Sequence, residues 1–239
     1  MNPVIQVRNL KKHYGKLKAV DGISLSVEKG EIFGLLGHNG AGKTTAVECM
    51  TGTKQPDGGE VAILSQDPQK ERKRLFQRVG VQFQGTAFQD RLKVRELCRL
   101  NQSLYRQAEP WQIVLEHFGL AEKQNSFVSS LSGGQRQMLA LALAVMHRPE
   151  VLFLDELTTG LDPKARRKVW QYLNSLKKQG TTVFLTSHYM EELEALCDRV
   201  AVMRQGRFLT TGKVGQVITT SGQATLEQAY LHFMEEDII

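Results

Sequence analysis

Residues 37–44 combine the side chains and the spacing that are needed to hold a phosphate group. The segment reads Gly37-His38-Asn39-Gly40-Ala41-Gly42-Lys43-Thr44, which matches the phosphate-binding loop pattern G-x-x-x-x-G-K-S/T. Glycines let the backbone curl so that its N–H groups face phosphate oxygens, and the helix that follows contributes its positive end. Lys43 would reach the β- and γ-phosphates, and the Thr44 hydroxyl would bind Mg²⁺. A glycine-rich turn without a ligand is the alternative.

Two adjacent carboxylates, Asp155 and Glu156, directly follow the apolar residues 151–154. A carboxylate at the end of a buried strand can hold Mg²⁺, directly or through water. Glu156 has no obvious salt-bridge partner nearby in the sequence, so it could polarise an attacking water as a general base. The pair therefore suits phosphoryl transfer, although simple loop polarity would also account for an Asp-Glu pair after a strand.

A second segment suited to an anion is Leu131-Ser132-Gly133-Gly134-Gln135. Ser132 is a good N-cap for the helix that is expected to follow it. The two glycines would let a ligand approach exposed N–H groups at the positive end of that helix. The sequence thus contains two candidate anion sites that are separate from each other.

The elements that must position these residues alternate between strands and helices. Strands are expected at residues 4–10, 19–28, 32–36, 60–64, 79–84, 151–154, 181–186, 200–203 and 207–211. Helices are expected at residues 45–50, 68–78, 163–180, 189–196 and 225–234, and in a purely helical stretch at 94–107, 110–118 and 132–147. This pattern indicates a mostly parallel sheet covered on both faces, with an inserted helical lobe. Ligands of such sheets bind beyond the carboxyl ends of the strands, where the phosphate loop is expected.

Composition narrows the class of protein without naming a ligand. The 239 residues include 31 Lys and Arg against 25 Asp and Glu, a mild excess that does not distinguish nucleic acid, an anionic membrane surface and nucleotide. Three cysteines lie far apart, which argues against a disulfide framework or a zinc site and for a reducing compartment. No secretion signal is visible at the N-terminus, and the longest apolar run, residues 139–146, is too short to span a bilayer. Any membrane role is therefore expected to come from a partner.

The motifs and their order resemble the nucleotide-binding subunit of ATP-binding cassette (ABC) transporters over nearly the whole chain. Residues 37–44 match the Walker A motif of that family, residues 151–155 match Walker B, and residues 131–135 match the ABC signature. Residues 160–162 look like the D-loop, and His188 looks like the switch histidine that senses the γ-phosphate. The resemblance implies an ATPase that uses ATP and Mg²⁺, with Glu156 as the catalytic base.

Further site residues follow from the same resemblance. Gln84 falls at the Q-loop position, where a glutamine amide both ligates magnesium and orients water. Tyr14 falls where the family stacks an aromatic ring on adenine, and Val20 and Thr45 are placed among the ATP-binding residues. The implied metal site consists of Thr44, Gln84 and Asp155, and the implied catalytic group of Glu156, His188 and Gln84. Each of these three residues also has an alternative without a function in catalysis or binding. Tyr14 could be an ordinary aromatic residue of a hairpin, and Gln84 could be a polar residue at the edge of a strand. His188 could be a loop histidine whose hydrogen bonds are made within the protein.

The resemblance also implies partners. In the family, two subunits close head to tail, so that ATP lies between one phosphate loop and the signature of the other subunit. Ser132, Gly133, Gly134, Gln135 and Asp162 would then act on the ATP of the partner copy, and Asp162 could also be a helix N-cap. Integral membrane subunits would dock near Gln84 and the helical subdomain. The protein would be cytoplasmic and peripheral on the inner face of the cell membrane, and no nucleic acid is expected.

The predicted fold class is α/β, a phosphate-loop NTPase core with a mostly parallel sheet, an N-terminal antiparallel β region and an inserted helical subdomain. The expected divisions are the first part of the core at 1–86, the helical subdomain at 87–148, the second part of the core at 149–220, and a C-terminal helix at 221–239. Leu157 and Met138 depart from the proline and arginine that the family usually has at these positions.

Three functions compete within the family. Residues 186–192 and 225–231 resemble the branch that exports drugs, antibiotics and polysaccharides through separate membrane subunits. An importer subunit is the second possibility, and the sequence leaves no room after its core for the regulatory domain of many importers. A non-transport ATPase that acts on DNA or ribosomes is the third, and the two cassettes or long coiled-coil insertion usual in such proteins are not seen.

Overall fold

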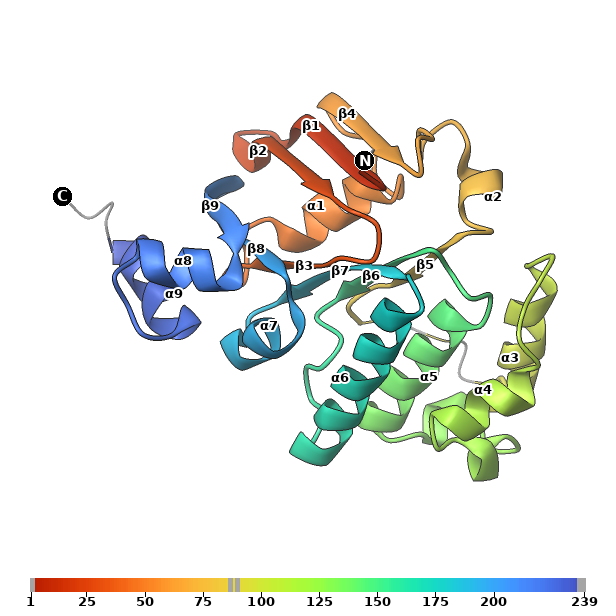
Figure 1. Ribbon diagram of the computed structural model, residues 1–239. Coiled ribbons are helices and arrows are strands. Elements are labelled where there is room, and N and C mark those ends of the chain that lie inside the picture. The colour runs from red at the N-terminus through yellow and green to blue at the C-terminus, as the bar shows by residue number, and fades with distance from the viewer. Residues whose placement is uncertain (1–2, 86–87, 89–90, 236–239) are drawn as a thin grey trace.

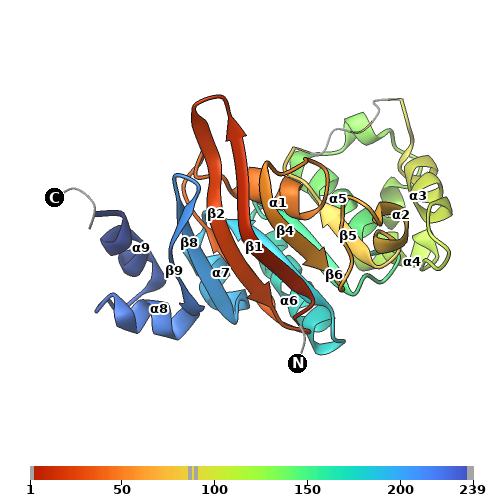
Figure 2. The ribbon, with the colours of Figure 1, turned by 90° about the horizontal axis from the view of Figure 1, so that it is seen from above.

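The protein consists of a small β-sheet above a larger one, with helix α1 between the two sheets and further helices below the larger sheet (Figure 1). The computed structural model describes residues 3–85, 88 and 91–235. Figure 2 shows a lobe of helices at one end of the molecule and helices α8 and α9 at the other. The α/β class that the sequence predicts is confirmed.

The larger sheet has the strand order β5-β6-β7-β3-β8-β9. Its strands are β3 (Ile32–Leu36), β5 (Val79–Gln82), β6 (Val151–Asp155), β7 (Thr182–Ser187), β8 (Arg199–Arg204) and β9 (Arg207–Lys213). The strands from β5 to β8 in the order of the sheet are parallel to their neighbours, and the edge strand β9 pairs antiparallel with β8. Every residue of β3, β6 and β7 is buried, which explains why these strands contain runs of consecutive apolar residues instead of an alternating pattern.

The smaller sheet is antiparallel, in the order β2-β1-β4, and contains β1 (Ile5–Tyr14), β2 (Leu17–Val27) and β4 (Gly58–Ile63). The β1–β2 hairpin turns at Gly15, whose φ of 59° suits a residue without a Cβ. The buried side of this sheet joins the inner side of the larger sheet and helix α1 (Lys43–Met50) in one core, which includes Ile5, Phe33 and Phe184. Ala41 of the phosphate loop belongs to this core, which anchors the loop.

The helical lobe comprises α3 (Val94–Ser103), α4 (Trp111–His117), two short 3₁₀ turns (Ala121–Lys123 and Val128–Ser130) and α5 (Gly133–Val145). It has an apolar core of its own, which contains Trp111, Leu115 and Leu139. Helix α5 also packs against strand β5 of the larger sheet. The lobe is therefore attached to the core along the helix that begins with the second candidate anion site.

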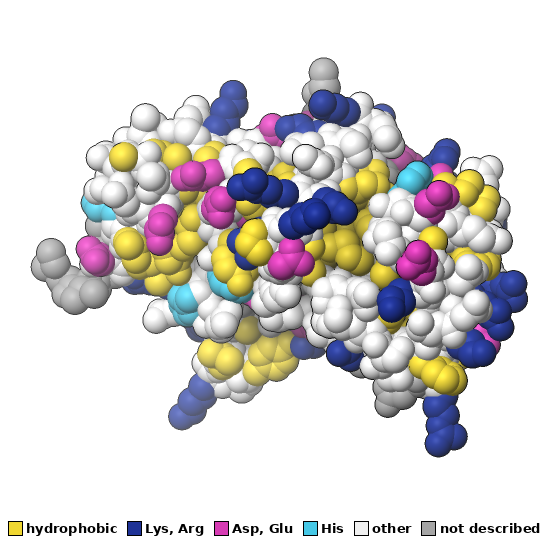
Figure 3. Space-filling view, turned by 90° about the horizontal axis from the view of Figure 1, so that it is seen from below, with side chains coloured by type: hydrophobic (Ala, Val, Ile, Leu, Met, Phe, Trp, Pro, Cys, Tyr) yellow, Lys and Arg dark blue, Asp and Glu magenta, His cyan; other side chains and the backbone are white. Residues whose placement is uncertain are grey.

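The remaining helices are α2 (Arg72–Leu75), α6 (Pro163–Lys178), α7 (Met190–Leu196), α8 (Val214–Thr220) and α9 (Leu226–Glu235). Below the larger sheet, hydrophobic side chains on the surface are interspersed with Lys, Arg, Asp and Glu side chains (Figure 3). Within the described ranges, every helix falls short of the length and apolar character that crossing a bilayer requires.

Two helices are shorter than the sequence predicts, and one was not predicted. The helix expected at 68–78 is only α2, four residues long, because turns on both sides connect it to β4 and β5. Helix α3 ends at Ser103 because the Gln77 side chain holds the following turn, with Nε2 donating to Leu104 O and Oε1 accepting from Arg106 N. Helix α8 is the helix that was not predicted. Its sequence gives little indication of a helix, because it has only seven residues, among them a glycine and two β-branched threonines.

His147, which follows α5, is buried and should make the stability of the protein depend on pH. It is 6% exposed, and its ring stacks on Tyr105 with centroids 3.9 Å apart. Burial lowers the pKa of His147 to about 4, against an ordinary value of 6.5. The unfolded chain therefore binds a proton between these pH values that the folded chain does not. We expect this group to reduce the free energy of unfolding by about 3 kcal/mol as the pH falls from about 6.5 to about 4.

Urea unfolding at several pH values checks this prediction. His147→Phe should unfold with a shallower pH dependence than wild type, and His117→Gln, at an exposed position of α4, should leave the pH dependence as it is. Equal slopes for wild type and His147→Phe would show that another group is responsible.

Candidate active site

The phosphate loop runs from the end of β3 to the start of α1. Gly40 and Gly42 have φ angles of 84° and 106°, a region that L side chains rarely adopt. A Cβ at Gly42 would lie 2.0 Å from the carbonyl oxygen of Ala19, so only glycine fits here. The backbone therefore curls as the motif requires, with Lys43 at the first position of the helix.

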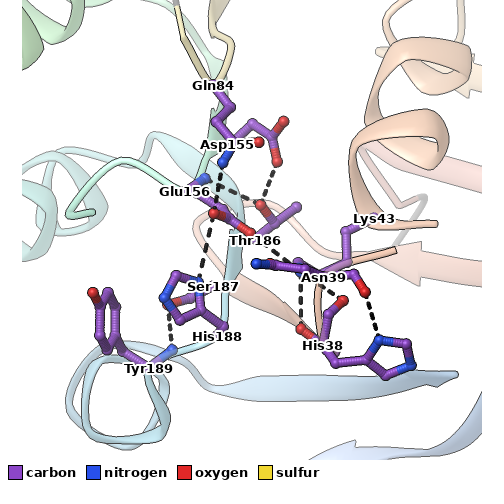
Figure 4. Close-up of polar contacts among 11 residues, drawn as sticks. His38, Asn39, Lys43, Gln84, Asp155, Glu156, Thr186, Ser187, His188 and Tyr189 are labelled. Carbon is purple, nitrogen blue, oxygen red and sulfur yellow. Dashed lines mark hydrogen bonds and ion pairs between the residues drawn. The ribbon is translucent and has the colours of Figure 1, made fainter. Parts of the chain in front are cut away.

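Lys43 lies inside the curl, with only 5% of its side chain exposed. Its Nζ donates to the carbonyl oxygen of Gly37 at 2.8 Å and to that of His38 at 3.3 Å (Figure 4). It also forms an ion pair with Glu156 Oε1 at 3.2 Å. The lysine is thus held between its own loop and the carboxylate that follows strand β6.

Glu156 is the point on which the other predicted catalytic side chains converge (Figure 4). Its Oε2 accepts a hydrogen bond from Gln84 Nε2 at 2.9 Å and lies 3.5 Å from His188 Nδ1. Its backbone is left-handed, with φ 51°, and the N–H donates to Thr186 Oγ1 at 3.1 Å. Such a backbone is costly for a non-glycine residue and persists where its surroundings fix it, which is common at functional sites.

Asp155 lies one residue earlier and is fully buried. Its Oδ1 accepts a hydrogen bond from the Thr186 hydroxyl, whereas Oδ2 has no hydrogen-bond partner among the described residues. Burial raises the pKa of this carboxyl, and the hydroxyls of Thr186 and Thr44 act in the opposite direction. A buried carboxylate oxygen without a partner, next to a threonine hydroxyl, fits a hard divalent cation such as Mg²⁺.

A cavity of about 880 Å³ opens beside the phosphate loop. Six residues of the motif region line it, namely Asn39, Gly40, Gly42, Lys43, Thr44 and Thr45. Glu156 forms part of the wall, as does Tyr14 from the end of β1. The ammonium groups of Lys12 and Lys54 lie 5.7 and 5.4 Å from the centre of the Tyr14 ring. The cavity has the size of a small-molecule site and combines phosphate-binding and aromatic groups.

Val20, which the family resemblance places among the ATP-binding residues, is not among the residues that line the cavity. It is fully buried in the core between the two sheets, and the cavity is lined instead by its neighbours Lys18, Ala19 and Asp21. Whether Val20 contacts ATP stays a prediction. Gly37, His38 and Ala41 also lie outside the lining, and they form the frame of the loop.

Several cavity residues were missed by sequence reasoning. Lys16 and Lys18 come from the β1–β2 hairpin, and Arg204 and Arg207 come from the β8–β9 turn. The two segments are joined by an ion pair in which Arg207 Nη2 lies 2.6 Å from Asp21 Oδ2. No local pattern could have indicated a contact between residues 186 positions apart.

The N-cap that the sequence predicts at the second candidate anion site is confirmed, but this segment is not part of the cavity. Ser132 caps α5, with its Oγ accepting from Gln135 N at 3.2 Å and its N–H donating to Gln135 Oε1 at 3.0 Å. A Cβ added to Gly133 would meet nothing within 4 Å, so the start of this helix is open to an approaching group. None of the described residues 131–135 lines the cavity beside the phosphate loop.

Asp162 is the N-cap of α6, which is one of the two roles that the sequence left open. Its Oδ1 accepts from the backbone N–H groups of Lys164 and Ala165, both at 2.9 Å. Pro163 occupies the first helical position, where its missing N–H costs nothing. The cap also fixes the loop that contains Gly160 and Leu161.

Leu157 and Met138 both fill buried or partly buried positions. Leu157 is 3% exposed, and its carbonyl oxygen accepts a hydrogen bond from Gln137 Nε2 at 2.6 Å. The start of α5 is thereby tied to the residue that follows Glu156. Met138 packs against the cores of both the lobe and the outer helices. An apolar side chain at this position therefore contributes to the joint between the lobe and the core.

A phosphate loop that leads from a parallel sheet into a helix, with carboxylates at the end of a neighbouring strand, defines a P-loop ATPase. Comparison with known proteins gives the family. Residues 20–159 match the family model described as "ABC transporter". A second model, for an AAA domain, matches the shorter segment 128–194. The chain belongs to the ABC transporter family and is an ATP-binding, ATP-hydrolysing protein of that family.

Curated relatives are similar over most of their length. Linearmycin resistance ATP-binding protein LnrL of Bacillus subtilis is 36% identical, across 94% of this chain and 74% of the relative. Nod factor export ATP-binding protein I of Ralstonia nicotianae is 39% identical, across 91% and 69%. Daunorubicin resistance ATP-binding protein DrrA3 of Streptomyces coeruleorubidus is 39% identical, across 91% of this chain and 71% of the relative.

Solved structures have the same fold. An ATP-binding subunit of an ABC transporter superposes with a TM-score of 0.90 at 23% identity, over 97% of this chain and all of that one. A dimeric bacterial ABC transporter cassette superposes with a TM-score of 0.77 at 27% identity, over 87% of this chain and 98% of that one.

Proposed function

We propose that this chain is the ATP-hydrolysing subunit of an exporter, which works through separate membrane subunits. The observation that carries the ATPase site is the convergence of Lys43, Gln84 and His188 on the single carboxylate of Glu156, next to the phosphate loop. Export is supported by relatives that are named for resistance to linearmycin and daunorubicin and for Nod factor export.

In this proposal, each residue has a separate task. The backbone N–H groups of the loop and the Lys43 ammonium bind the phosphates, and Tyr14 stacks on the base. Glu156 accepts a proton from the attacking water, and Gln84 orients that water while it donates to Glu156. His188, within 3.5 Å of Glu156, donates to the γ-phosphate and so makes hydrolysis depend on that group.

The proposed magnesium site is formed by Thr44, Gln84 and Asp155. The buried Oδ2 of Asp155, which has no hydrogen-bond partner in the described structure, supports this assignment. When bound, Mg²⁺ neutralises charge on the phosphates. The chain itself supplies oxygen ligands in a buried place where a carboxylate without a partner would otherwise be costly.

A second copy of the chain, or a close relative, completes the site. Ser132, Gly133, Gly134, Gln135 and Asp162 of one copy would contact the ATP that is bound to the other. Two observations on the described residues support this arrangement. The start of α5 is open at Gly133, and residues 131–135 do not line the cavity of their own chain. It is also supported by the similarity to a cassette that was solved as a dimer.

The membrane subunits are proposed to dock near Gln84 and the helical lobe, which would hold the protein at the inner face of the membrane. Leu100 and Leu104 lie one turn apart on and just after α3, and are 56% and 63% exposed. Exposed leucines at this spacing fit an apolar partner surface. The lobe (87–148) is proposed as a subdomain between the core segments 1–86 and 149–220, followed by a C-terminal segment at 221–239. The separate core of the lobe supports this division.

Purification from detergent-solubilised membranes, followed by reconstitution with the membrane subunits that copurify, tests the transport assignment. In inside-out vesicles, ATP added outside should drive substrate into the vesicles, and the membrane subunits should raise ATP hydrolysis. Movement out of the vesicles would indicate an importer. Hydrolysis that responds to duplex DNA or ribosomes, but not to the membrane subunits, would contradict a transport role.

A further inference from the structure

Helix α6 connects the loop that contains Asp162 to the segment that contains His188, the proposed γ-phosphate sensor. Asp162 is the N-cap of α6, and the helix packs against α7, which begins at Met190. Two side chains on α6, one helical turn apart, contact the start of α7. The first of these contacts is made with Tyr189, the residue that follows His188.

The first contact places a cation over an aromatic ring. The guanidinium carbon of Arg166 lies 4.6 Å from the centre of the Tyr189 ring. The Nε of Arg166 is buried without a hydrogen-bond partner among the described residues, so this part of the guanidinium relies on the face of the ring. Arg166 also belongs to the first turn of α6, where its N–H donates to the carbonyl oxygen of Asp162 at 2.9 Å.

The second contact joins the same two helices one turn further along. Trp170 donates from Nε1 to Glu192 Oε1 at 3.2 Å. Glu192 lies in the first turn of α7 and is 3% exposed. Trp170 and Met190 also pack against the same apolar core. The start of α7, with Tyr189 as its N-cap residue, is therefore held by α6 at two points.

Tyr189 passes this constraint on to His188. The two rings lie against each other, with centroids 4.2 Å apart and planes at 38° (Figure 4). The N–H of Tyr189 donates to the Ser187 hydroxyl oxygen at 3.0 Å, which fixes the backbone on both sides of His188. Ser187 is buried at the end of strand β7. The histidine is thus held between a buried strand and the start of a helix.

The imidazole of His188 depends on such a restraint. Its side chain is 33% exposed, and Nδ1 lies 3.5 Å from Glu156 Oε2, which is longer than an ordinary hydrogen bond. Within the described part of the chain, Nδ1 makes no hydrogen bond. The stack on Tyr189 therefore limits rotation of the ring where hydrogen bonding does not, and it determines where the imidazole nitrogens point.

We propose that Tyr189 is a positioning residue for ATP hydrolysis, which holds the His188 imidazole in its working orientation and is itself held by Arg166. Tyr189 lies outside the residues that line the cavity. Its effect passes through His188, so its loss should lower kcat without weakening ATP binding. The inference rests on the proposed action of His188 on the γ-phosphate.

Tyr189→Leu is the direct test, and Tyr189→Phe is the conservative variant that keeps the ring. We expect Tyr189→Leu to lower kcat about 3- to 10-fold, the range of one aromatic pair, with the KM for ATP within about twofold of wild type. Tyr189→Phe should restore kcat to nearly the wild-type value. The ring-proton NMR resonances of His188, assigned with His188→Gln, should shift in Tyr189→Leu and stay in place in Tyr189→Phe.

Arg166→Met tests the same stack without changing Tyr189. It should lower kcat about 2- to 5-fold, and adding it to Tyr189→Leu should lower kcat no further, because the cation then has no ring to hold. Arg167→Met is the matched control, since Arg167 is the neighbouring arginine at an exposed position of α6. It should leave kcat unchanged.

Three results would overturn the proposal. The first is an unchanged kcat in both Tyr189→Leu and Arg166→Met. The second is an equal fall in kcat in Tyr189→Leu and Tyr189→Phe, because the ring would then not be the cause. The third is a fall in Tyr189→Leu while His188→Gln hydrolyses ATP at the wild-type rate, because the effect would then not pass through His188.

Failure of this inference is separable from failure of the proposed function. If Glu156→Gln and His188→Gln both lower turnover and Tyr189→Leu does not, only the role of Tyr189 is lost. If Glu156→Gln hydrolyses ATP normally, the proposed active site itself is wrong.

Discussion

Lys43→Ala is expected to abolish measurable ATP binding. The ammonium lies inside the loop, on the carbonyl oxygens of Gly37 and His38, at the edge of the cavity. Hydrogen bonds that involve a charged group contribute about 1.5–3 kcal/mol each, so losing the contacts to two phosphates should weaken binding by roughly 10²-fold or more. Titration with a fluorescent ATP analogue measures this. Lys18→Ala is the control. Lys18 lines the same cavity, but its side chain is 59% exposed, so its loss should change the affinity for ATP little.

Lys43→Ala is also expected to lower the stability of the fold, and this effect can be measured separately from the loss of ATP binding. Lys43 and Glu156 form an ion pair in which each side chain is 5% exposed, so Lys43→Ala leaves a buried carboxylate without its cation. We expect a loss of stability on the order of 3 kcal/mol, measured by urea unfolding. The double variant Lys43→Ala/Glu156→Gln should recover much of that stability but none of the ATP binding. Unchanged affinity in Lys43→Ala would refute the assignment of the loop.

Glu156→Gln is expected to reduce turnover about 10²- to 10⁴-fold while ATP still binds, because an amide cannot accept the proton from water. Glutamine has the same shape, and its oxygen can still accept the hydrogen bond from Gln84 Nε2. Phosphate release at saturating ATP measures turnover. Glu116→Gln, at an exposed position of α4, is the control and should hydrolyse ATP at the wild-type rate. Near-normal turnover in Glu156→Gln would remove Glu156 from the role of base.

The part of the site that is contiguous in sequence could be predicted from sequence. The loop around Lys43 has a fixed spacing, and the short apolar runs before it and before Asp155 are typical of buried strands, which the structure confirms. Gln84 and His188 were assigned through the family resemblance, and the structure brings both to Glu156. Whether they act in hydrolysis stays a prediction until the variants are measured.

The remaining features depend on contacts between distant segments. Arg207 reaches the cavity because it pairs with Asp21 across two sheets, and no local pattern encodes that pairing. Val20 was assigned to the ATP-binding residues through the family resemblance, and the structure buries its side chain in the core between the sheets.

The central claim is that each chain provides half of an ATP site and that a second copy provides the rest. Sedimentation velocity of Glu156→Gln with and without ATP and Mg²⁺ tests it most directly. We predict a monomer without ATP and a dimer with it, since slow hydrolysis keeps the bridging ligand in place. Gly133→Arg in the same background should bind ATP but stay monomeric, because a Cβ added at Gly133 meets nothing within 4 Å in its own chain and the arginine would extend from this open position towards a partner. A monomer in the presence of bound ATP, or a dimer that forms despite Gly133→Arg, would contradict the claim.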